Sequence, residues 1–316
     1  MDESATGSVR SFVRDQAWLG PVSDRDRRLA LGVGWAPMRV SVGDVELFVR
    51  DVGEGRPLVA LHGGPGLDGS VWFPGLDPLA RDGWRILAPD HRGNGRSDAG
   101  DPARWTVSQM ADDVEELIRR LELARPVVLG WSFGSFVAQA HMARHGTADA
   151  YVLFGTIAEA SALDRVHEQL ERFLPEQLRA QVTASWEREA TVQTAEECRR
   201  LWHDQIPFHV LDPEGPLVEQ LRAQDEIVFR PEVLRHFAAG GSYGMEGWRE
   251  QLRSCGKPVL VVSGEGDRTT DPASAHELAQ LLPRGEEVVI PGAAHLFLYE
   301  RPAETLAALR TFLARV

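Results

Sequence analysis

Cysteine is scarce in this sequence, and long apolar runs are absent from it. The 316 residues include two cysteines, Cys198 and Cys255, which are too few for a disulfide framework and favour a reducing compartment. The N-terminus carries charged residues where a signal peptide would have an apolar segment. No apolar run approaches the length that spans a bilayer. We therefore expect a cytoplasmic protein without a membrane partner.

Positive charge is also in short supply. Asp and Glu outnumber Lys and Arg by 47 to 34, and the net charge is −13. Such a surface repels phosphates, which argues against nucleic acid as a partner. No residue spacing is typical of a metal site, and we expect neither a metal nor an organic cofactor. A hydrophobic content of 43% with 26% charged residues is ordinary for a globular protein.

Strand-like apolar runs alternate with helical patterns along the chain. The segments 38–42 and 45–50 flank Gly43 and Asp44, which is typical of a hairpin. Within residues 107–121 the apolar positions are spaced for one face of a helix. This alternation predicts an α/β fold in which a mostly parallel, doubly wound sheet has helices on both faces. The remaining strand runs are 57–62, 84–89, 126–130, 150–154, 258–263 and 287–290.

A region without strand runs interrupts this pattern. Residues 157–249 look helical and are expected to form an insertion in a catalytic domain that consists of residues 38–156 and 250–316. Residues 1–37 precede that domain as a polar N-terminal extension. Residues 157–250 carry 18 acidic and 10 basic side chains. The inserted region is therefore strongly acidic.

The most informative motif lies at residues 127–135. An apolar, β-branched run ends at Gly130, Ser132 follows two residues later, and Gly134 follows two residues after that. A Gly-x-Ser-x-Gly motif between a strand and a helix is typical of a nucleophile elbow, with the serine at the apex of a strained turn. Side chains at the two flanking positions would collide with nearby backbone, and glycine avoids this. The motif predicts that Ser132 is a catalytic nucleophile; the alternative is a plain strand–helix turn.

An acid and a base are expected downstream, in the order serine, acid, histidine. Asp267 comes just after the strand run at 258–263, and His295 follows the run at 287–290. Residues past the ends of parallel strands lie at the edge of the sheet where ligands bind. We therefore predict that Asp267 and His295 complete a catalytic triad. The alternatives are two neighbouring acids, Glu265 and Asp271, and three upstream histidines, His62, His91 and His141.

A glycine-rich loop follows the strand run at 57–62. It reads His62-Gly63-Gly64-Pro65-Gly66. Such a loop lets backbone N–H groups approach a substrate oxygen, together with the N–H that follows the nucleophile. We predict that the N–H groups of Phe133 and Gly64 form an oxyanion hole, with Gly63 as the alternative to Gly64.

Taken together, these motifs resemble those of the α/β-hydrolase superfamily. The glycine-rich loop is similar to that of its proline iminopeptidase (prolyl aminopeptidase) group of serine hydrolases. The resemblance covers residues 38–156 and 250–316, and it implies that the inserted region is a helical cap (lid). The chain departs from that group's usual residues at three positions. The motifs that carry the resemblance are residues 62–66, Asp90-His-Arg-Gly-Asn-Gly-Arg-Ser97, the nucleophile elbow and Gly264-Glu-Gly-Asp267. The three positions that depart from the group are His91, Trp131 and Phe133.

The expected function is hydrolysis of an amide or ester by acyl transfer through Ser132, His295 and Asp267. The resemblance implies release of an N-terminal residue from a small-molecule or short-peptide substrate. One alternative is an esterase, lactonase or thioesterase acting on a small metabolite. Another is a non-hydrolytic lyase or acyltransferase on the same fold.

The cap is expected to determine which substrate is bound. Trp131 and Gly63 are predicted to contact the substrate, and Asp90 and Arg92 to brace the loop beside the site. The resemblance implies that a cap carboxylate holds a substrate amino group, with Glu159 as the first choice. The other acidic candidates are Asp204, Asp225, Glu226 and Glu246. The aromatic candidates for a pocket wall are Trp186, Trp202, Phe208, Phe229, Phe237, Tyr243 and Trp248.

Overall fold

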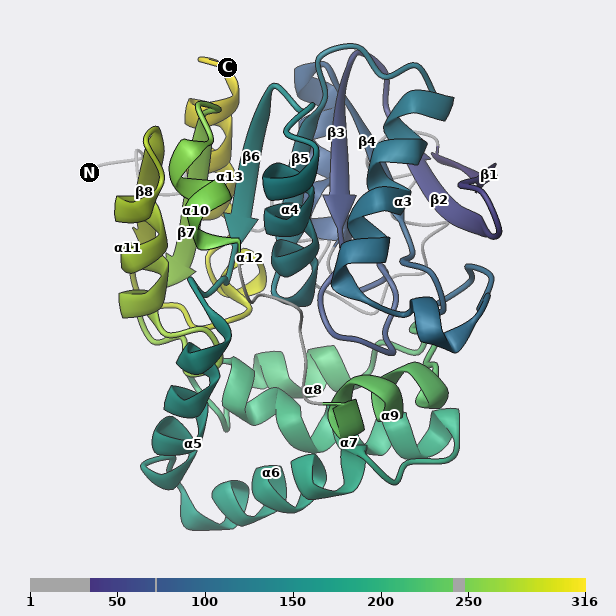
Figure 1. Ribbon diagram of the computed structural model, residues 1–316. Helices are drawn as coiled ribbons and strands as arrows, with labels where there is room; N and C mark the ends of the chain where they lie inside the picture. Colours follow the sequence, from purple (N-terminus) through teal and green to yellow (C-terminus); the bar gives the residue numbers. More distant parts are fainter. Residues whose placement is uncertain (1–34, 72, 241–247) are drawn as a thin grey trace, which may run out of the picture.

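One sheet of eight strands forms the centre of this computed structural model, which describes residues 35–71, 73–240 and 248–316. The strand order is β1-β2-β4-β3-β5-β6-β7-β8. Strand β2 is antiparallel to β1 and β4, and all the other neighbours are parallel. The predicted α/β fold is confirmed (Figure 1). The strands are β1 (Trp35–Ser41), β2 (Glu46–Val52), β3 (Arg56–Leu61), β4 (Trp84–Pro89), β5 (Val127–Trp131), β6 (Ala150–Phe154), β7 (Val259–Gly264) and β8 (Gly285–Ile290).

All the predicted strands are present, and only their ends differ. Strand β1 begins at Trp35 rather than at residue 38, because its pairing with β2 continues until Trp35 lies opposite Val52. The predicted extension over residues 1–37 therefore overlaps the first strand, and the rest of that extension lies outside the described residues.

Helices cover both faces of the sheet and build two hydrophobic cores. In β3, Leu58 and Ala60 point into one core, whereas Val59 and Leu61 point into the other. This alternation is what a strand buried on both faces requires. The first core also contains side chains of the 3₁₀ segment η1 (Phe73–Asp82), α12 (Phe297–Glu300) and α13 (Pro302–Leu313). The second contains side chains of α3 (Val107–Arg120), α4 (Phe133–Arg144), α10 (Arg249–Ser254) and α11 (Pro272–Leu281).

Between β6 and β7, the described residues form helices and no strand. In Figure 1 helices α5 to α9 lie beyond the edge of the sheet toward which the parallel strands point, whereas α10 belongs to the layer on one face of the sheet. We call α5 to α9 the cap helices. None of the helices in the described part of the chain is both long and apolar enough to span a membrane. The cap helices are α5 (Asp164–Glu171), α6 (Glu176–Glu189), α7 (Ala195–His209), α8 (Pro216–Arg222) and α9 (Pro231–Gly240).

Helix α7 has a well-defined start. Thr194 is its N-cap, and the Thr194 hydroxyl accepts the N–H of Glu197 at 3.1 Å. The Glu197 carboxylate in turn accepts the N–H of Thr194 at 3.1 Å. This capping box satisfies backbone donors that the first turn of a helix leaves unpaired. The beginning of the longest cap helix is thus specified by its local sequence.

Arg92 joins the loop after β4 to helix α3. Its side chain is fully buried and donates two hydrogen bonds of 2.6 Å to the Asp113 carboxylate. Asp44 is a second acidic partner at 3.2 Å. Burial raises the pKa of Asp113, and the Arg92 guanidinium opposes that rise. The position of Arg92 supports the structural role predicted for it.

Removing Arg92 should therefore destabilise the fold. The variant Arg92→Met leaves Asp113 buried without its cation, which typically costs about 3–5 kcal/mol. Urea unfolding followed by circular dichroism would measure the loss. Arg119→Met is the matched control, because Arg119 pairs with Glu116 on the exposed surface of α3, the helix that carries Asp113. This variant should change the unfolding midpoint little. Equal unfolding midpoints for the two variants would contradict the prediction.

Candidate active site

Ser132 occupies the sharp turn between β5 and α4. Its backbone has φ 54° and ψ −121°, a conformation that side-chain-bearing residues seldom adopt. A Cβ atom on Gly130 would lie 2.2 Å from the Gly134 carbonyl oxygen, and one on Gly134 would lie 2.2 Å from the Leu61 carbonyl oxygen. Both contacts are shorter than any real Cβ contact, so the two glycines are needed for this turn.

Hydrogen bonds hold the turn in place. The Ser132 N–H donates to the Phe154 carbonyl oxygen at 2.8 Å. The Ser132 carbonyl oxygen accepts both the N–H of Ser135, at 2.8 Å, and its hydroxyl, at 2.6 Å. Helix α4 begins at Phe133, so the Phe133 N–H belongs to a first helical turn, whose donors are not used within the helix.

Asp267 and His295, each placed just after a strand, meet in a hydrogen bond. His295 Nδ1 lies 2.9 Å from the Asp267 carboxylate. Because a carboxylate can only accept, Nδ1 carries the proton and Nε2 is left as the basic nitrogen. The Asp267 carboxylate also accepts the N–H groups of Thr269 and Thr270, at 2.8 and 2.9 Å, and the Thr270 hydroxyl, at 2.7 Å. The acid is thus fixed from several sides.

These contacts keep Asp267 ionised. Burial on its own would raise the pKa of Asp267, but the neighbouring imidazole of His295 and the hydrogen bonds from Thr270 outweigh it and lower the pKa. The two rival acids have other partners. Asp271 caps α11 by accepting the Ala273 N–H at 3.0 Å, and Glu265 accepts the Gly292 N–H at 3.0 Å. The geometry therefore supports Asp267 as the acid.

The upstream histidines serve the surrounding structure. His62 Nε2 accepts the N–H of His91 at 3.0 Å, so its Nδ1 is the protonated nitrogen and donates to the Gly63 carbonyl oxygen at 2.9 Å. Burial lowers the pKa of His62 to about 4 and that of His91 well below its usual range. His141 lies between the Tyr151 hydroxyl and Glu115, 3.0 Å from each. Of these four histidines, His295 is the one that is bonded to an acid and lines the same cavity as Ser132.

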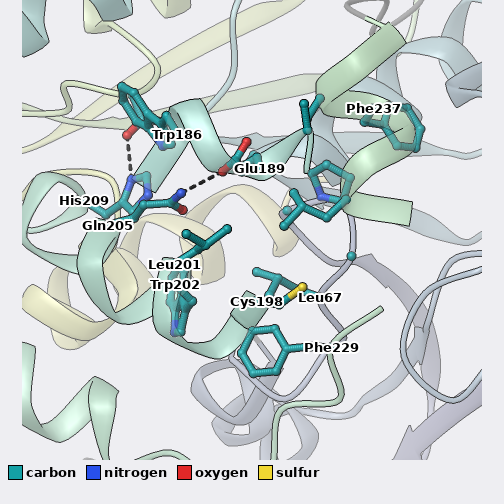
Figure 2. A pocket seen from close by; sticks show the side chains of 18 of the residues that line it. Leu67, Trp186, Glu189, Cys198, Leu201, Trp202, Gln205, His209, Phe229 and Phe237 are labelled. Carbon is teal, nitrogen blue, oxygen red and sulfur yellow. Dashed lines mark hydrogen bonds between the residues drawn. The ribbon is translucent and has the colours of Figure 1, made fainter. Parts of the chain in front are cut away.

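Ser132 and His295 open onto one cavity of about 460 Å³ beneath the cap helices. The loop after β3 contributes Gly64 to Leu67, and Gly64 has a φ of +59°. Most of the remaining wall comes from the cap and is apolar or aromatic (Figure 2). The cap side chains around it are Val166, His167, Trp186, Glu189, Ala190, Cys198, Leu201, Trp202, Gln205, His209, Phe229, Leu234, Phe237 and Ala238.

Two polar side chains of the cap, Glu189 on α6 and Gln205 on α7, face each other between these helices. The Gln205 side-chain N–H donates to the Glu189 carboxylate at 2.7 Å, as Figure 2 shows. Burial raises the pKa of Glu189 to about 7, although the bond from Gln205 opposes that rise. Glu189 was not among the acidic candidates from the sequence, and within the described part of the chain it is the one carboxylate in the wall of the cavity.

Three residues predicted to contact the substrate, Trp131, Gly63 and Glu159, do not line this cavity. Trp131 is fully buried and stacks on Phe297 with ring centroids 5.3 Å apart. Gly63 is buried, and its carbonyl oxygen accepts a hydrogen bond from His62. Glu159 is exposed, and its carboxylate lies 4.0 Å from Arg249. The loop contact with the cavity therefore begins at Gly64.

The remaining candidates divide between cavity, core and surface. Trp186, Trp202, Phe229 and Phe237 line the cavity as predicted. Phe208 is instead fully buried, and Trp248 packs against the second core. Asp225 and Glu226 are exposed and Asp204 half-buried, all three outside the cavity wall. Tyr243 and Glu246 lie outside the described residues.

Comparison with known proteins reveals an extended likeness. The family model described as the alpha/beta hydrolase fold matches residues 56–302. AB hydrolase superfamily protein YisY of Bacillus subtilis is 27% identical in an alignment of 281 positions that covers 85% of this chain and 95% of that protein. The proline iminopeptidase of Lactobacillus helveticus is 26% identical in an alignment of 292 positions that covers 85% of this chain and 94% of that protein. A thermophilic esterase from Thermogutta terrifontis superposes with a TM-score of 0.67 at 25% identity, covering 89% and 98% of the two chains.

The backbone strain at Ser132 has a measurable consequence. Glycine adopts this conformation without strain, whereas alanine keeps the strain and removes only the hydroxyl. We therefore expect Ser132→Gly to be more stable than Ser132→Ala by about 1 kcal/mol, as measured by thermal or urea unfolding. If Ser132→Ala were the more stable of the two, the strain would not be an energetic feature of the folded protein.

Proposed function

Since this chain belongs to the alpha/beta hydrolase fold family and is a hydrolase of that family, we propose that it is a serine hydrolase acting through an acyl-enzyme on Ser132. The observation that carries the proposal is the placement of three groups. Ser132, on a strained turn, opens onto the same cavity as His295, which is bonded to Asp267. The proposed substrate is a small molecule or short peptide with an ester or amide bond.

In the proposed first step, the Ser132 hydroxyl attacks the substrate carbonyl carbon and His295 Nε2 takes its proton. Asp267 stabilises the imidazolium that forms. The N–H groups of Phe133 and Gly64 are the proposed donors to the oxyanion, and losing one such donor typically costs about 3 kcal/mol of barrier. The alcohol or amine then leaves with the proton from His295. In the second step, water deprotonated by His295 attacks the acyl-enzyme, and Ser132 regains its proton.

For the substrate, we propose release of an N-terminal residue, as in proline iminopeptidases. The supporting observation is Glu189, a carboxylate in an otherwise largely apolar wall. A substrate ammonium group bound there would donate charge-assisted hydrogen bonds to the ionised carboxylate. The Gln205 amide, 2.7 Å from Glu189, would keep that carboxylate oriented.

A second candidate is an esterase for a small, mainly apolar substrate. Glu189 also favours this candidate, because burial raises the pKa of its carboxyl group to about 7. Near neutral pH a substantial fraction of the carboxyl groups would be protonated in the empty cavity. A neutral Glu189 bonded to Gln205 would accommodate an uncharged substrate as well as a charged one.

The proposed mechanism predicts large losses from two substitutions. Ser132→Ala should abolish turnover, and Asp267→Asn should lower kcat by about 10⁴-fold, because the imidazole would lose the acceptor that fixes its tautomer. Asp271→Asn is the matched control, four residues further on and at a helix cap, and should leave kcat within about twofold. Initial rates on p-nitrophenyl acetate and proline p-nitroanilide would measure all three. Retained hydrolysis in Ser132→Ala, or a larger loss in Asp271→Asn than in Asp267→Asn, would rule out the proposed assignment.

The choice between the two substrates depends on Glu189. If an ammonium group binds there, Glu189→Gln should raise KM for proline p-nitroanilide by at least about tenfold, which corresponds to about 1.4 kcal/mol. It should leave p-nitrophenyl acetate nearly unaffected. The advantage of wild type over Glu189→Gln should shrink as the pH falls below about 7, because the protonated carboxyl group carries no charge.

The N-acetylated form of proline p-nitroanilide is the substrate control. Cleavage of the free-amine anilide alone would support the aminopeptidase. Hydrolysis of the acetate ester with neither anilide cleaved would exclude it and favour the esterase.

A further inference from the structure

We propose that His209, the last residue of cap helix α7, is a positioning residue that links the filling of the cap cavity to the geometry of the His295–Asp267 pair. The inference rests on the proposed serine-hydrolase function. It adds a role for a cap residue outside the predicted triad and its sequence motifs. The end of α7 contacts both of the loops that carry the proposed acid and base.

The first contact reaches the loop of the acid. His209 Nδ1 and the Thr269 hydroxyl are 2.7 Å apart and share a hydrogen bond. Thr269 also donates its backbone N–H to the Asp267 carboxylate at 2.8 Å. One residue therefore binds the cap through its side chain and the acid through its backbone. A displacement of His209 would be felt by the turn that holds Asp267.

Arg268 fastens the same loop a second time. Its guanidinium donates to the carbonyl oxygens of Val210, at 2.8 Å, and Leu211, at 3.3 Å. These carbonyls lie just beyond the end of α7, where backbone acceptors have no partner within the helix. Asp267 is therefore followed directly by two residues, Arg268 and Thr269, that bond to the end of α7 and the residues after it.

The loop of the base is held by the same end of α7. The N–H of Leu296 donates to the His209 carbonyl oxygen at 3.1 Å. Glu300 accepts the N–H of Leu211 at 2.6 Å and the N–H of Ala294 at 2.7 Å. Ala294 and Leu296 are the two neighbours of His295. Both sides of the base are thus bonded, directly or through Glu300, to residues 209–211.

His209 can lie beside the base because it is uncharged. Its ring centroid is 5.5 Å from that of His295. Burial and the neighbouring His295 lower the pKa of His209 to about 3. A charged ring there would oppose the positive charge that His295 acquires during the proposed reaction. A neutral ring supplies a hydrogen bond without that penalty.

The cavity side of α7 completes the link. Cys198, Leu201, Trp202 and Gln205 line the cavity from the same helix, and the Trp202 ring stacks on His209 with centroids 5.9 Å apart. An acyl group that fills the cavity therefore packs on the helix whose end holds the acid and the base. Interactions of this kind, if they improve the alignment of the reacting groups, raise kcat and not only affinity.

Thr269→Val tests the link, since it removes the hydroxyl and keeps the backbone N–H to Asp267. The readout is kcat for p-nitrophenyl acetate, butyrate and hexanoate, which differ only in the acyl group. In wild type, kcat should rise with acyl length. In Thr269→Val we expect kcat for the hexanoate to fall about tenfold and the ratio of hexanoate to acetate to approach one. Fluorophosphonates of two alkyl lengths give the same comparison as rates of Ser132 labelling, without a substrate.

Several variants separate this role from a general loss of structure. Thr269→Ser restores the hydroxyl and should recover the wild-type ratio. Thr183→Val removes a cap hydroxyl that bonds only within helix α6, to the Arg179 carbonyl oxygen, and should leave kcat unchanged. At position 209, Asn can place a polar atom near that of Nδ1, so His209→Asn should retain more of the ratio than His209→Leu. This pair decides the matter if Thr269→Val does not fold.

An unchanged ratio in both Thr269→Val and His209→Leu would overturn the proposal, as would an equal fall in kcat for the short and long esters. Such results differ from a failure of the serine mechanism, which would appear as retained hydrolysis in Ser132→Ala.

Discussion

The close approach of backbone segments around Ser132 is the constraint on which the rest of the site depends. Strand β5, helix α4 and the end of β3 come so near to one another that no Cβ atom fits at Gly130 or Gly134. This places Ser132 beyond the sheet edge and in a conformation that costs on the order of 1–3 kcal/mol. Such strain persists only because the surrounding sheet is buried on both faces and cannot relax around one turn.

The parts of the site that could be predicted from the sequence are those fixed by local pattern. Two glycines at a set distance from Ser132 indicate the turn, although a Cβ atom on Gly130 would collide within the turn and one on Gly134 would collide with the Leu61 carbonyl oxygen of β3. Asp267 and His295 could be placed because parallel strands end at the same edge, so residues that follow them gather there. Their mutual hydrogen bond then follows from sheet order, since β7 and β8 are neighbours.

The cavity wall was harder to predict, for two reasons. Trp131 is next to Ser132 in the sequence, but it belongs to β5, which is covered on both faces. The Trp131 side chain therefore points into the first core. Whether an acidic residue of the cap reaches the cavity depends on which face of its helix turns inward. Composition does not reveal this, so it does not distinguish Glu159 from Glu189. One signal was available: Gln205 and His209 follow Cys198, Leu201 and Trp202 at the spacing of one helix face. Polar residues on an apolar face indicate a function for that face.

The site is thus built from two parts of the chain, and substitutions are less constrained in one part than in the other. The proposed catalytic groups come from loops of the sheet, and the cavity wall comes mainly from the cap. A new side chain on the inner face of α6 or in the middle of α7 changes the cavity and leaves those loops alone. The end of α7 is different, because residues 209–211 are bonded to both loops. Related proteins with names as different as iminopeptidase and esterase are compatible with this division. Substrate choice can change along the cap helices, whereas the junction of α7 with the proposed acid and base is constrained by both loops at once.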